Sequence, residues 1–160
     1  MSKKLIYLLL PLIMIVYSCS EDSETLIIEE NNTEEVIDLT ITGEILKLVN
    51  EHRETLGLTL LKRNNTADDL SNDHTQYMID QGKISHDYFE NRWTVLRQVE
   101  NARSAGENVA SGYQDANSVM NAWMNSTGHK ENIEGDFTHI GIAAKKDSQN
   151  RYYFTQLFFR

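Results

Sequence analysis

Three polar side chains in the second half of the chain could do chemistry together. Glu107 lies between a glycine and an asparagine, and His86 and His129 lie 21 residues before it and 22 residues after it. Neutral imidazoles with a carboxylate suit zinc or a similar divalent cation, and three protein ligands with open positions are typical of a catalytic metal site. The separations differ from those of a His-Glu-Xaa-Xaa-His helix, so a metal site requires the fold to bring the three residues together.

Each of these side chains also has a structural interpretation. Glu107 is either a functional acid or a buried one that bonds backbone amides and one of the two histidines, because an unpaired buried carboxylate is costly. For His86 and His129 we favour a place in the lining of a cleft, since histidine is the common metal ligand and proton carrier. For His74, a third candidate, we favour a structural role.

A hydrolase would need a nucleophile or an activated water. The only cysteine is Cys19, far from these residues, and no serine lies in a Gly-Xaa-Ser-Xaa-Gly turn. Ser126 near His129, with Glu107 behind them, is the one Ser-His-acid set that the sequence offers. A serine close to a histidine across a capping turn is more typical of a hydrogen-bonded helix end.

Helices must position these candidates. Apolar residues from Ile45 to Leu56 recur at helical spacing, and Gly57 is expected to end that helix. A second helix starts after Thr66, with acids in its first turn, and turns His74 inward. Residues 94–101 are expected to form a short third helix. Residues 115–125 form a fourth with Val119, Ala122 and Trp123 on its inner face; Gly128 is expected to stop it and to place His129 just beyond its end.

The sequence of the last part of the chain predicts β-strands. Residues 138–144 and 152–159 are rich in β-branched and aromatic residues and are expected to form an antiparallel hairpin through residues 147–150. Residues 109–111 are expected to supply a third strand, with helices on both faces of the sheet. The predicted fold class is α+β with a small antiparallel sheet.

The N-terminus reads as a targeting segment. Residues 1–18 resemble a signal peptide, with Lys3 and Lys4 before an apolar run too short to span a bilayer. The run ends in a lipobox-like sequence at Cys19, so we expect lipid attachment to Cys19; the alternative is a leftover thiol behind an ordinary signal. Attachment of more than one acyl chain would anchor the protein to the membrane.

Residues 19–42 are expected to form an acidic tether between the signal peptide and a single domain at residues 43–160. Residues 20–42 carry eight acids and no lysine or arginine, which predicts a self-repelling linker. The acids directly after Cys19 resemble the export signal of surface lipoproteins in some two-membrane bacteria, the alternative being a plain linker. The domain keeps 16 acids against 13 bases without a basic stripe, so we expect no nucleic-acid partner.

Several motifs occur together in the order found in the bacterial branch of the CAP superfamily, also called the SCP or cysteine-rich secretory, antigen 5 and pathogenesis-related domain. They are Leu48-Val49-Asn50-Glu51-His52-Arg53, Ser85-His86, Gly106-Glu107-Asn108, Gly128-His129-Lys130-Glu131-Asn132 and Phe137-Thr138-His139. The resemblance covers nearly all of residues 43–160. It implies a three-layer α/β/α sandwich.

The resemblance also implies a cleft with two histidines and two acids that can hold a divalent cation such as Zn²⁺. His86, Glu107 and His129 match three of these positions, whereas Ser126 stands where the family has its second acid. His74 matches a further imidazole of the bacterial branch. The metal ligands implied here are His86 and His129.

Our leading interpretation is an extracytoplasmic binding module, anchored to the cell envelope through lipid on Cys19. The family is associated with sterol, lipid and envelope ligands, and its activity differs among members, so catalysis is less favoured. One alternative is a metal- or Ser-dependent hydrolase of envelope or host substrates. Another is a structural adhesin.

Overall fold

The computed structural model describes residues 40–160. The signal peptide, Cys19 and the tether up to residue 39 lie outside the described residues, so the predictions made for them stay predictions. Within residues 40–160, no helix combines the length and the apolar character needed to cross a bilayer.

Helix α1 covers Ile41–Thr55 and starts two residues before the expected domain boundary at residue 43. Thr40 caps it, because its hydroxyl accepts a hydrogen bond from the backbone N–H of Gly43 at 3.2 Å. As the sequence predicts, the chain leaves the helix through Gly57, which has a φ of 67°. The buried face of α1 consists of Gly43, Ile45, Val49 and Arg53.

Helix α2 covers Asn65–Gln81, and α3 covers Phe89–Val99. The cap of α2 is Asn64, whose side chain accepts from the N–H of Ala67, so Thr66 lies inside the helix and not before it. Helix α3 begins five residues earlier than expected. Its buried face consists of Arg92 and Leu96. Because Arg92 is charged, the sequence lacks the regular spacing of apolar residues that would predict the first turns of this helix.

Helix α4 covers Ala116–Met124, and α5 covers Thr127–Ile133. Asp115 and Ser118 form a reciprocal capping box at the start of α4. The prediction that Gly128 stops α4 is wrong: the chain turns at Asn125 and Ser126, and Gly128 and His129 belong to the first turn of α5. Burial of Ile133 accounts for this extra helix, because it gives α5 an apolar anchor in the core.

The sheet has four strands in the order β1-β3-β4-β2. The strands are β1 (Lys62–Arg63), β2 (Ala105–Ser111), β3 (His139–Lys146) and β4 (Tyr152–Phe159). The predicted β3–β4 hairpin is confirmed, and β2 pairs antiparallel with β4. The short strand β1, parallel to β3, is not predicted by the sequence. Strand β2 starts four residues earlier than predicted, which places Glu107 inside a strand.

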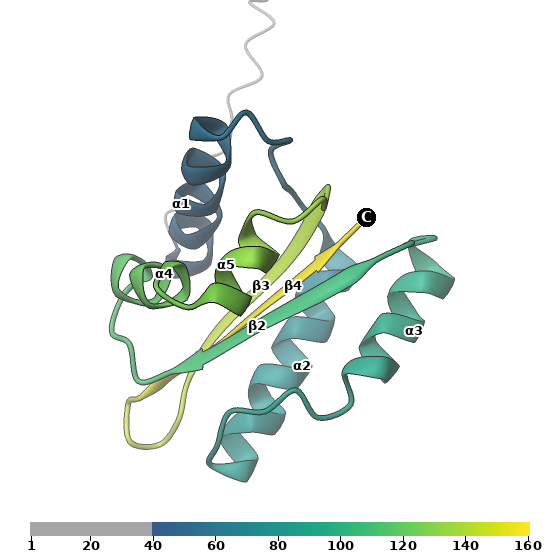
Figure 1. The fold of residues 1–160 in the computed structure, drawn as a ribbon. Helices are drawn as coiled ribbons and strands as arrows, with labels where there is room; N and C mark the ends of the chain where they lie inside the picture. The colour runs from purple at the N-terminus through teal and green to yellow at the C-terminus, as the bar shows by residue number, and fades with distance from the viewer. Residues whose placement is uncertain (1–39) are drawn as a thin grey trace, which may run out of the picture. The chain divides into compact units, whose positions relative to one another are not determined.

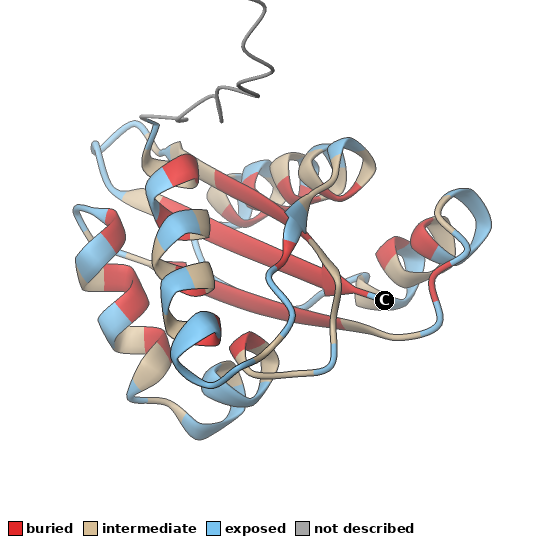
Figure 2. Cartoon of the chain, turned by 90° about the horizontal axis from the view of Figure 1, so that it is seen from above, coloured by how far each residue is buried: buried red, intermediate tan, exposed pale blue. Residues whose placement is uncertain are grey.

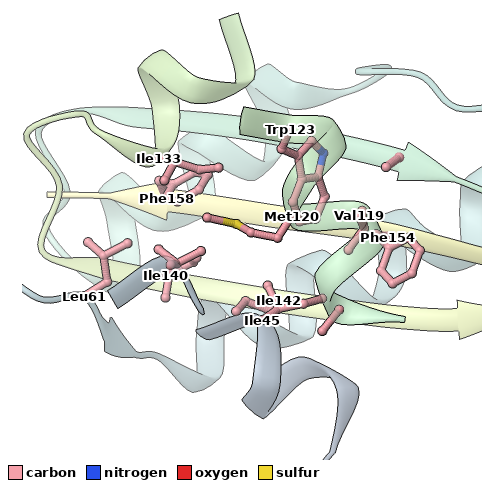
Figure 3. Close-up of a cluster of buried hydrophobic side chains, with 13 residues drawn as sticks. Ile45, Leu61, Val119, Met120, Trp123, Ile133, Ile140, Ile142, Phe154 and Phe158 are labelled. Carbon is pink, nitrogen blue, oxygen red and sulfur yellow. The ribbon is translucent and has the colours of Figure 1, made fainter. Parts of the chain in front are cut away.

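Helices cover both faces of the sheet (Figure 1). Helices α1, α4 and α5 lie on one face and α2 and α3 on the other, and Figure 2 shows the strands buried between them. The larger core cluster packs α1 and α4 on the sheet through Trp123, Phe154 and Phe158 (Figure 3). Leu96, Leu157 and Phe159 belong to the cluster under α2 and α3. The α/β/α sandwich expected from the sequence is confirmed.

Candidate functional site

The candidate residues gather around β2, the strand at one edge of the sheet (Figure 1). Successive side chains of a strand point to opposite faces. Glu107 therefore points toward α2 and α3, where its partners lie, and Asn108 points toward α5. His86 lies in the α2–α3 loop and His129 on α5, so the two histidines approach β2 from opposite faces of the sheet.

The Glu107 carboxylate is almost completely buried, with its side chain 2% exposed. It receives two hydrogen bonds from the Arg92 guanidinium, at 2.7 Å from Nε and 2.8 Å from Nη2. The His86 Nδ1 lies 2.8 Å from Oε1 of the same carboxylate. Glu107 is thus a buried acid tied to α3 and to the α2–α3 loop, as in its structural interpretation. Its main partner, Arg92, is not among the residues that the sequence singles out.

His74, on α2, binds the backbone of the α2–α3 loop. Its ring is buried, and Nε2 donates to the backbone carbonyl of Ser85 at 2.7 Å while lying 3.7 Å from Glu107 Oε1. Burial lowers the pKa of His74, although the charge of Glu107 partly opposes that effect. The ring also stacks on Tyr77. These contacts agree with the favoured structural role.

His86 and His129 face the edge of β2 with different exposures. The His86 side chain is 54% exposed, and only its Nδ1 is hydrogen-bonded to Glu107. His129 is half-buried; burial lowers its pKa, and a charge on His86 lowers that pKa further. Both effects favour the uncharged form of the His129 imidazole.

Two cavities flank this point along β2. One, of about 210 Å³, is lined by His86, Phe89 and residues 105–107. The other, of about 230 Å³, is lined by residues 109–111 together with Ile84, Tyr113, Ala122, Trp123, Ser126 and His129. We call the two cavities and the strand between them the β2 groove. Ser126 and His129 share one cavity and Glu107 lines the other, so the Ser-His-acid set considered above is not assembled.

The residues present do not match a three-ligand zinc site. Among residues 40–160, no group of three or more His, Cys, Asp or Glu side chains is placed to hold a metal ion. The Glu107 oxygens are occupied by Arg92 and His86, and a serine replaces the expected second acid. Within residues 40–160, the lining of the two cavities still offers the imidazoles of His86 and His129 to a cation.

Side-chain amides hold the α5 side of the groove. Asn108 donates to the carbonyl of His129 at 3.1 Å, and Asn132 donates to the carbonyl of Glu107 at 3.1 Å. Trp123 Nε1 reaches the carbonyl of Val109 at 3.4 Å. Gly106 leaves room for this approach, because a Cβ there would lie 2.6 Å from Asn132 Oδ1. The amides fix His129 through its backbone.

Solved structures from bacteria resemble this fold. An outer surface protein of Borrelia burgdorferi superposes with a TM-score of 0.66 and 26% identity, covering 72% of this chain and 89% of that one. An extracellular SCP-domain protein of Bacillus anthracis superposes with a TM-score of 0.66 and 28% identity, covering 75% of this chain and 40% of that one.

Two curated relatives come from Bacillus subtilis. The uncharacterised protein YkwD is 31% identical over 103 residues, which are 62% of this chain and 40% of that protein. The uncharacterised membrane protein YlbC is 28% identical over 130 residues, or 78% and 36% of the two chains. The chain thus spans about two fifths of the length of these relatives. Residues 46–158 match the family model of the cysteine-rich secretory proteins, and the chain therefore belongs to the CAP family.

Proposed function

We propose that the protein is an extracytoplasmic binding module whose ligand lies in the β2 groove. The observation that carries this proposal is the pair of cavities beside β2, one lined by His86 and the other by His129. The α2–α3 loop beside them exposes two large apolar side chains, Ile84 at 47% and Tyr88 at 63%. Exposed apolar side chains at the mouth of a cavity favour ligand contact.

The lining favours an uncharged ligand with an apolar part. Arg92 compensates the charge of the buried Glu107 carboxylate, and burial favours the uncharged form of His129. Val109, Tyr113 and Trp123 supply apolar surface beside the Ser126 hydroxyl. A neutral lipid, a sterol or an uncharged envelope component has the required character.

The backbone amide signals of the purified protein test this proposal. Neutral lipids and peptides, titrated separately, should shift the amides of residues 105–111 and 126–129. Ile84→Ser should weaken these chemical-shift changes. Val99→Ser should not, because Val99 is also an exposed aliphatic residue but lies at the end of α3 and lines neither cavity. Shifts confined to other surfaces would contradict a ligand site in the groove.

We further propose that the protein is anchored outside the cytoplasm. The lipobox-like sequence before Cys19 supports this, and so do the surface or extracellular descriptions of two similar proteins. We expect mass spectrometry to find an acylated Cys19 at the N-terminus of the mature protein. Cys19→Ser should move the protein from the detergent phase to the aqueous phase; unchanged partitioning would place the anchor elsewhere.

Zinc is expected to bind weakly through His86 and His129, because two imidazoles without an anionic ligand are fewer ligands than a tight site needs. Affinity should fall as the pH drops through the imidazole pKa values, since protons compete for the same nitrogens. Calorimetric titration at two pH values tests this prediction. Binding that survives His86→Ala combined with His129→Ala, or no binding to the wild type, would rule out the site.

A further inference from the structure

The outer edge of β2 presents backbone groups at every second residue. Ser104 and Arg160 exchange two backbone hydrogen bonds, and Gly112 N–H donates to Tyr152, so the even-numbered residues of β2 bond β4. In an antiparallel pair the intervening residues direct their N–H and C=O groups away from the partner strand. Glu107 and Val109 therefore direct both backbone groups outward.

The two outward carbonyls already have partners, whereas the N–H groups do not. Asn132 donates to Glu107 O, and Trp123 donates to Val109 O. In residues 40–160, no hydrogen bond uses the N–H of Glu107 or of Val109. The edge thus offers donors two residues apart, about 7 Å from one another by strand geometry.

These donors lie at the floor of the β2 groove. Each cavity is lined by three consecutive residues of the strand, 105–107 in one and 109–111 in the other. Because side chains of consecutive residues alternate between faces, three in a row share one cavity only along the strand edge. Ile84 and His86 form one wall of the groove, and Trp123 and His129 form the other.

We propose that the β2 groove binds a peptide segment in extended conformation, which adds to the sheet beside β2. This inference rests on the proposed binding function and names its ligand class. Carbonyls on one side of an extended peptide repeat with the same spacing as the Glu107 and Val109 donors, a match that an acyl chain or a sterol lacks. The carbonyls of β2 keep a second lone pair for the N–H groups of the peptide.

The second cavity selects the side chain of this peptide. Its volume of about 230 Å³ holds one large apolar side chain against Trp123, Tyr113 and Ile84. The balanced charges of Glu107 and Arg92 give no partner to a charged peptide. An uncharged extended segment with one bulky apolar residue fits best.

The test uses the purified full-length chain and capped, fluorescein-labelled nonapeptides of alternating threonine and serine, randomised at the three central positions. Members with a central leucine or phenylalanine should bind about tenfold more tightly than those with alanine. Their binding should move the amide signals of Glu107 and Val109 downfield. Replacing the matching peptide amides with esters, which are weaker acceptors, should lower affinity about threefold to tenfold per bond.

Two variants serve as a matched pair. Ile84→Ser should lower peptide affinity about tenfold, and Val99→Ser should leave it unchanged, because both residues are exposed aliphatics but only Ile84 lines the groove. Equal affinities for the two variants, or unmoved Glu107 and Val109 amides, would overturn the peptide assignment.

Neutral phosphatidylcholine vesicles separate this inference from the proposed function. If vesicles move the groove amides and no peptide does, the peptide assignment is wrong and the binding function stands. If neither probe moves them, both proposals fail.

Discussion

Replacing Gly141 with alanine is expected to cost about 3 kcal/mol of unfolding free energy or more, because the new methyl group has no space. Gly141 is the third residue of β3, at a point where α2 packs on the sheet. A Cβ at this position would lie 2.5 Å from the backbone nitrogen of Asp68 and closer still to the carbonyl group of Ala67. Backbone atoms of a helix cannot rotate away as a side chain can, so α2 would have to move as a whole.

Urea denaturation of Gly141→Ala measures this loss. Gly128→Ala is the matched control, since a Cβ at Gly128 in α5 would meet nothing within 4 Å. Alanine is favoured over glycine in helices by up to about 1 kcal/mol, so the control should be neutral or slightly stabilised. Similar stabilities for the two variants would show that α2 and β3 do not pack as closely as described.

Glu107→Ala should destabilise the fold by about 3 to 5 kcal/mol, because it leaves the buried Arg92 guanidinium without its carboxylate. The α2–α3 loop would also lose the bond from His86. Ser126→Ala should change stability by less than about 0.5 kcal/mol, since the Ser126 side chain makes no capping hydrogen bond at the start of α5.

Thermal and urea unfolding of the two alanine variants measure this difference. Replacing both charged residues by apolar ones, as in Glu107→Leu with Arg92→Met, should recover much of the lost unfolding free energy, because no unpaired charge remains buried. Small and equal effects of Glu107→Ala and Ser126→Ala would mean that the carboxylate is hydrated rather than buried. A double variant as unstable as Glu107→Ala would mean that the polar groups themselves are required.

The sequence predicts helices and strands best where the periodicity of the apolar residues agrees with the positions of the capping and turn residues. The strand predicted at residues 152–159 has the bounds of β4, since nearly every residue there favours a strand. The start of β2 is not predicted, because Gly106, Glu107 and Asn108 have low strand propensity and are held there by β4 and side-chain bonds. Gly128 predicts a helix stop, although glycine is also tolerated in the first turn of a helix.

The candidate site shows a similar division. The motifs assign His86 and Glu107 to one cleft, but sequence separation gives no reason to prefer His86 over His129 as the partner of Glu107. Strand alternation decides this pairing, because it turns Glu107 away from α5. The sequence does not predict that Arg92 pairs with Glu107, because a single arginine in a helix is usually exposed to solvent. The signal that could find it is its place four residues before the buried Leu96.

The surroundings of β2 also affect how two copies of the protein can meet. An unpaired strand is an aggregation hazard, since a second molecule can extend the sheet. Here the edge is flanked by the α2–α3 loop with its exposed Ile84 and Tyr88 side chains, and a second copy would bring a second such loop to the same edge. The opposite edge, β1, is two residues long and carries Lys62 and Arg63, which also discourages pairing. Both edges of the sheet thus carry features that disfavour pairing with a second copy, whereas the extended peptide proposed above would bring no second loop.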